Sequence, residues 1–191
     1  MFRFLSSPIS RMFLLSLAVY VITGFLGYAV SQVQGGGDAS RKTIEAVAQV
    51  LGPMANLEPP FMMVAIFLNN SIKALAIILL GFTLGVVPFI FLAVNGVVTG
   101  LVIGEIGELA GVGVAVAALA PHGIIEIPAL LLASALGFLV SRATVRRIMG
   151  REDRPGKELK RSLTLFLQIV LPALLVASAV EAFVTPLLIQ R

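Results

Sequence analysis

Apolar stretches of membrane-crossing length follow one another along most of this chain. A helix crosses the hydrocarbon core of a bilayer with roughly 20 consecutive apolar residues. We predict five such spans, at about residues 12–30, 61–80, 86–104, 123–141 and 163–188. Only 13% of the 191 residues are charged and 58% are hydrophobic, so a soluble surface cannot be built. The predicted fold is all-α, a polytopic transmembrane helix bundle that forms a single domain over residues 1–191.

Residues 40–51 form a predicted helix outside the spans. Ile44, Val47 and Leu51 recur at helical spacing, and the charged residues of this segment fall largely on the other side. An amphipathic helix on the membrane surface fits this pattern. A loop helix in water, packed on the ends of the spans, fits it equally well.

The apolar segment 109–120 has 12 residues, too few to span a bilayer. A single helix over 109–141 would have 33 residues and a length of about 50 Å, too long for one upright span. We therefore predict a helix break at Pro121 and Gly123, with Pro128 shortly after it. This makes 109–120 a separate short helix, either re-entrant or interfacial.

Basic residues gather in one loop. Eight of the 14 Lys and Arg residues lie between Arg142 and Arg161, a local topology signal that does not resemble a nucleic-acid-binding face. Because cytoplasmic loops are enriched in Lys and Arg, we place this linker, Arg3 and Arg11 inside the cell. The prediction is a multi-pass protein of the cell membrane with a cytoplasmic N-terminus and an external C-terminus. The first apolar stretch exceeds an ordinary signal-peptide core, so we expect it to be an uncleaved span.

The residues needed for common enzyme chemistry are missing from the sequence. Cysteine is absent and His122 is the one histidine, so thiolate sites and histidine-rich metal sites are excluded. The chain holds no H-E-x-x-H, G-x-S-x-G or phosphate-binding glycine loop. We therefore expect no enzyme activity, no metal and no cofactor.

Polar side chains inside the predicted spans are the candidate functional residues, because ionisable groups are costly in lipid. Lys73 and Glu126 could neutralise each other across two spans. The cluster is either a functional polar site at membrane depth or a clamp that fixes helix packing. Its predicted members are Asn69, Asn70, Lys73, Asn95, His122 and Glu126.

Three glycines, Gly96, Gly100 and Gly104, repeat every four residues in the third span. A stripe of small residues lets another helix approach closely. The partner helix belongs to the same chain or, in a dimer, to a second copy.

Three sequence pieces carry a family resemblance: FLNNSIKAL at 67–75, LAVNGVVTG at 92–100 and APHGIIEIPAL at 120–130. Over roughly residues 60 to 145 the chain resembles the stage II sporulation protein M family, including its uncharacterised archaeal branch. The resemblance implies a polytopic membrane protein. In spore-forming bacteria, members are known as partners of cell-wall-degrading enzymes at the division septum, and the family offers no catalytic residue to carry over.

The sequence favours a membrane scaffold or a subunit of a membrane complex. The alternative is a small transporter or channel, which would need a homo-oligomer to enclose a path of useful size. An intramembrane hydrolase using His122 and Glu126 is the third hypothesis, and it lacks a nucleophile. The expected partners are the lipid bilayer and either a second copy or other membrane proteins, with no nucleic acid.

The predicted orientation can be tested with single cysteines, because the chain contains none of its own. In intact cells, a membrane-impermeant thiol reagent should label Ser40→Cys, which lies outside, and should leave Arg154→Cys unlabelled until the cells are lysed. The opposite pattern would contradict the predicted topology.

Overall fold

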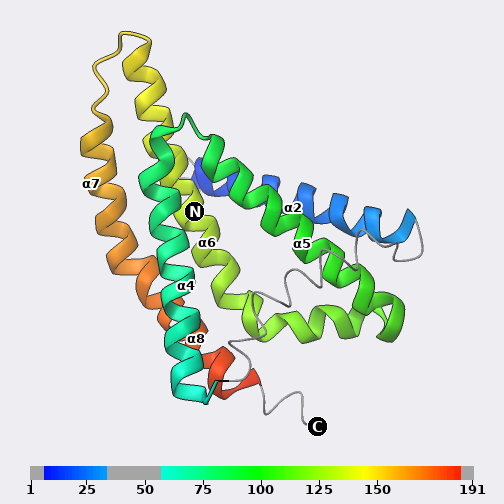
Figure 1. Ribbon diagram of the computed structural model, residues 1–191. Helices are drawn as coiled ribbons and strands as arrows, with labels where there is room; N and C mark the ends of the chain where they lie inside the picture. Colours follow the sequence, from blue (N-terminus) through cyan, green and yellow to red (C-terminus); the bar gives the residue numbers. More distant parts are fainter. Residues whose placement is uncertain (1–6, 34–56, 186–191) are drawn as a thin grey trace.

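The computed structural model describes residues 7–33 and 57–185 (Figure 1). This part of the chain consists of helices joined by short turns, with no strand, and five of its helices are long and apolar enough to cross a membrane. The predicted five-span helix bundle is therefore confirmed. The predicted helix at 40–51 and the end of the last predicted span lie outside the described residues.

The helices extend several residues beyond the predicted spans. α2 covers Pro8–Val33, and α4 covers Pro59–Leu79 and continues through the 3-10 turn η1, Leu80–Phe82. α5 covers Val86–Ala110 and α6 covers Val112–Ile148. The last span comprises α7, Pro155–Leu165, the π-helical turn η2, Phe166–Val170, and α8, Leu171–Phe183.

One hydrophobic core lies between α4, α6 and the α7–α8 span, which run side by side (Figure 1). Small residues bring α4 and α6 together. A Cβ atom added at Gly137 would lie 2.8 Å from the Ile77 carbonyl oxygen, and one at Gly81 would lie 2.9 Å from the Val140 Cβ. The Ser141 hydroxyl donates a hydrogen bond of 2.6 Å to the Gly81 carbonyl. Residue numbers rise together along the contact, so α4 and α6 are parallel.

The second close contact joins α2 to α5 through the predicted glycine stripe. A Cβ atom at Gly100 would overlap the Gly24 carbonyl oxygen and lie 2.6 Å from the Tyr28 nitrogen. Gly96 and Gly104 face α2 in the same way, against the Tyr20 carbonyl and the Ser31 side chain respectively. The stripe thus forms a contact within one chain, and α2 and α5 also run parallel.

The predicted helix break at Pro121 and Gly123 is wrong. The break lies at Gly111, whose φ of 91° suits glycine and reverses the chain between α5 and α6. α6 then continues through Pro121, Gly123 and Pro128 without interruption. A proline removes one backbone hydrogen bond, which can bend a helix without ending it. The first turns of α6 run crosswise to the rest (Figure 1), so bending accommodates the excess length.

Residues 109–120 are consequently not a separate helix. Leu109 and Ala110 end α5, and residues 112–120 form the first turns of α6. The spanning part of α6 is Gly123–Ile148, close to the predicted 123–141.

The α2–α5 contact predicts a large difference between two Gly→Ala variants. Gly100→Ala should lower the free energy of unfolding by about 1–3 kcal/mol, because the methyl group meets the backbone of α2. Gly113→Ala is the matched control, since no atom lies within 4 Å of its added Cβ. It should be neutral or stabilising by up to about 1 kcal/mol. Thermal unfolding in detergent measures both, and equal midpoints would contradict the tight contact.

Candidate functional site

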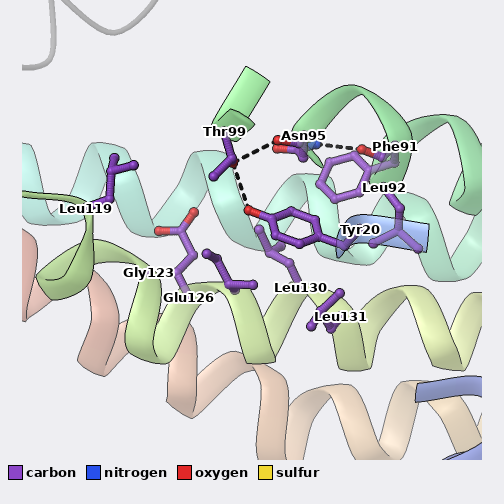
Figure 2. Close-up of a pocket in the computed structure, with 11 residues that line it drawn as sticks. Tyr20, Phe91, Leu92, Asn95, Thr99, Leu119, Gly123, Glu126, Leu130 and Leu131 are labelled. Atoms are coloured by element: carbon purple, nitrogen blue, oxygen red, sulfur yellow. Dashed lines mark hydrogen bonds between the residues drawn. The ribbon is translucent and has the colours of Figure 1, made fainter. Parts of the chain in front are cut away.

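A cavity of about 90 Å³ lies where α2, α5 and α6 meet (Figure 2). Four of its lining side chains carry oxygen atoms, and the others are apolar apart from one glycine. The lining residues are Tyr20, Phe91, Leu92, Asn95, Thr99, Leu119, Gly123, Glu126, Ile127, Leu130 and Leu131. The cavity is therefore a polar site with apolar walls inside a helical membrane domain.

A chain of hydrogen bonds runs along the α5 side of the cavity. The Thr99 hydroxyl donates to the Asn95 carbonyl at 2.8 Å. The Tyr20 and Thr99 hydroxyl oxygens are 2.8 Å apart. Because threonine has one hydroxyl proton, which the Asn95 carbonyl receives, Tyr20 must be the donor to Thr99. The Asn95 amide nitrogen donates to the Phe91 carbonyl at 2.7 Å.

Glu126 supplies the negative charge of the site. It lies early in the spanning part of α6, is 7% exposed, and points toward Thr99 and Tyr20 (Figure 2). None of the residues lining the cavity is a lysine or an arginine. Within the described residues, no three His, Cys, Asp or Glu side chains cluster closely enough to hold a metal ion. The site therefore combines one buried carboxylate with neutral oxygen donors and acceptors.

The structure divides the predicted polar cluster. Asn95 and Glu126 line one cavity, whereas Asn69, Asn70 and Lys73 of α4 do not. The Asn69 amide nitrogen donates to the Asn70 side-chain oxygen at 3.2 Å, and Asn70 is buried.

Lys73 lies apart from Glu126. It is exposed on α4, whereas Glu126 is buried in the cavity at the junction of α2, α5 and α6. Along the α4–α6 contact, Ile77 faces Gly137 and Gly81 faces Val140. This pairing places Lys73 beside residues of α6 that come after Glu126 in the chain. The ion pairs in which both side chains are described are Arg146–Asp153 and Arg161–Glu158. The predicted Lys73–Glu126 pair is not among them. His122 belongs to α6, one turn before Glu126, and its side chain lies outside the described part.

Two residues of the site, Tyr20 and Thr99, were not among those predicted from the sequence. Thr99 follows Asn95 by four residues, so helical spacing alone places both on one face of α5. Tyr20 has no comparable signal, because it lies in another span and reaches the site through the α2–α5 contact.

A family model and a known protein are similar to this chain. The family model described as stage II sporulation protein M matches residues 13–186. An uncharacterized protein of Methanocaldococcus jannaschii is 30% identical over 123 residues, covering 62% of this chain and 68% of the relative. No solved structure matches.

The Tyr20–Thr99 hydrogen bond should contribute measurably to stability. Tyr20→Phe and Thr99→Val should each lower the free energy of unfolding by about 1 kcal/mol, and the double variant should lose less than the sum. Thr144→Val is the control, because the Thr144 hydroxyl donates to the Val140 carbonyl of its own helix. It should show no coupling to Tyr20→Phe. Strict additivity of Tyr20→Phe and Thr99→Val would argue against the bond.

Proposed function

The chain belongs to the stage II sporulation protein M family, and we propose that it acts as a membrane scaffold or as a subunit of a membrane protein complex. One observation carries this proposal: Lys73 occupies the outward face of α4 near the middle of a membrane span. The proposal assigns the chain no reaction of its own.

Lys73 is far from both ends of its span, Pro59–Phe82. At 1.5 Å per residue it lies about 21 Å along the axis from Pro59 and about 14 Å from Phe82. Both distances exceed the roughly 6 Å reach of a lysine side chain, so its ammonium group does not easily reach water. The neighbouring Ile72 is 64% exposed, which marks this side of α4 as an outer surface.

A lysine facing lipid at this depth is costly. Insertion measurements assign about 2.5–3.5 kcal/mol to a lysine at the centre of a membrane helix. A carboxylate on an adjacent helix lowers this cost by neutralising the charge within low-dielectric surroundings. Because Glu126 is turned into the cavity on α6, we infer that the carboxylate comes from another membrane protein that packs against α4.

The remaining parts of the proposal come from the sequence. The protein is expected in the cell membrane with the N-terminus inside, as the basic 142–161 linker indicates. Family membership does not favour the transporter or channel alternative, which stays a prediction from the sequence.

Charge substitution at Lys73 tests the proposed contact. The protein is extracted from its native membranes in a mild detergent, and the complex is sized on a native gel. Lys73→Met should reduce the complex to a smaller species, because the partner carboxylate loses its counter-charge. Lys73→Arg should preserve the complex. Lys157→Met, in the exposed start of α7, is the control and should leave the size unchanged.

Photocross-linking separates the possible occupants of this face. A photoreactive amino acid in place of Ile72 should yield a cross-link to a second protein, and Lys73→Met should abolish it. The same replacement at Ile22, which is 60% exposed on α2, should not yield that product. Cross-links to another copy of the chain would instead identify a homo-oligomer. An unchanged complex and unchanged cross-links in Lys73→Met would reject the proposed contact.

A further inference from the structure

We propose that the outward face of α7 binds the headgroup of an anionic phospholipid through Lys157 and Lys160. This inference is independent of the contact proposed for Lys73, since no residue of α4 takes part. It holds for either orientation of the chain, because lipid headgroups cover both surfaces of a bilayer.

α7 presents two different faces. At 100° per residue, its exposed side chains lie within about 100° of arc around the helix. They are Lys157, Lys160, Arg161 and Thr164. Leu159 and Leu163, on the opposite side of the helix, pack against the hydrophobic core. This packing fixes the rotation of α7 and holds its basic side chains outward.

The positive charge of this face is only partly compensated. Among the described residues, Lys157 and Lys160 take part in no ion pair, whereas Arg161 lies 3.7 Å from Glu158. Residues 142–161 as a whole carry eight basic and three acidic side chains, a net charge of +5. Ammonium groups are attracted to an anionic lipid surface, and phosphate oxygens accept strong hydrogen bonds from them. The face therefore complements a negatively charged headgroup.

The α6–α7 hairpin extends past the end of the neighbouring spans. It rises beyond the turn that joins α4 and α5 (Figure 1). Ser141 of α6 lies at the level of that turn, because its hydroxyl donates to the Gly81 carbonyl. α6 continues from Ser141 to Ile148, which is about 10 Å at 1.5 Å per residue. The headgroup layer is roughly 5–8 Å thick on each side of a bilayer, so the hairpin passes through it.

The contacts between α6 and α7 give the depth of the two lysines. These antiparallel contacts are Ser162–Leu136 and Arg146–Asp153. Interpolation between them sets Lys157 level with Ser141, and Lys160 lies about one turn deeper. A lysine side chain reaches roughly 6 Å, so both ammonium groups extend into the headgroup layer.

The same side of the last span continues with apolar side chains. Leu167 is 60% exposed and follows Lys160 by two helical turns, about 10 Å toward the hydrocarbon. A phospholipid carries its phosphate above its acyl chains in the same order. Neither a free phosphate ion nor a soluble acidic protein would contact Leu167, so this face fits an anionic phospholipid.

Lipid binding in mixed micelles tests the inference. The purified full chain in a neutral detergent is titrated with phosphatidylglycerol or with phosphatidylcholine, and native mass spectrometry counts the bound lipid molecules. Phosphatidylcholine has the same phosphate but no net charge. Phosphatidylglycerol should bind about threefold or more tightly, because its headgroup has a net negative charge.

Two pairs of substitutions remove the same charge from different depths. Lys157→Gln with Lys160→Gln should raise the apparent Kd for phosphatidylglycerol by roughly 5- to 30-fold. Arg147→Gln with Arg151→Gln, at the exposed end of the hairpin, is the matched control. It should change the apparent Kd by less than about threefold at about 0.15 M salt, because screening weakens attraction beyond the headgroup layer. Lys157→Arg with Lys160→Arg should bind like the unmodified protein.

Three results would overturn the inference. Equal affinity for the two lipids would leave the basic face to a soluble acidic partner. Equal losses in the two Gln pairs would mean that the lipid responds only to the total charge of the hairpin. Displacement of phosphatidylglycerol by millimolar sodium phosphate, at constant ionic strength, would assign the face to free phosphate.

Discussion

The close backbone contact between α2 and α5 determines where the polar groups of this protein can meet. Side chains at Gly27, Gly96 or Gly100 would hold the two helices apart, because a Cβ atom at each of these glycines would collide with backbone atoms of the facing helix. In lipid no hydrophobic force drives helices together, so van der Waals contact between backbones becomes a principal source of association. Only at this short separation does the Tyr20 hydroxyl reach Thr99 at 2.8 Å.

The same principle organises the other half of the bundle. Gly81 and Gly137 bring α4 and α6 together, and Ser141 adds a hydrogen bond across that contact. α6 is the central element, since it contacts the α2–α5 pair as well as α4, α7 and α8. Because α6 bends (Figure 1), this one helix packs both against α2 and α5 and against α4, α7 and α8. Glu126 lies in the part of α6 where the cavity forms between these contacts.

Polar groups within the spans thus occupy two different surroundings. Glu126, Asn95, Thr99 and Tyr20 surround an internal cavity, where each can interact with its neighbours. Lys73 stands on an outer face, where its charge has to be stabilised from outside the chain. The first arrangement lets the polar groups meet within the chain, and the second suits a partner protein. A residue that costs stability in lipid is informative in both cases, because the surroundings have to compensate for it.

The sequence by itself determined the all-α membrane fold, the five spans and the spacing of the small residues. These properties depend on hydropathy and helical periodicity, which are local and can be read along the chain. The position of the helix break could not be predicted in this way. A proline in the sequence indicates only that one helix hydrogen bond is lost. The chain in fact reverses at Gly111, whose positive φ is known only from the folded structure. The composition of the site was also decided by tertiary structure. Asn95 and Glu126 share a cavity, Lys73 is turned away from it, and Tyr20 completes it from a span about 75 positions earlier in the chain than Asn95. The physical reason is that a span fixes which residues share a helix face, whereas the packing of several helices fixes which faces meet.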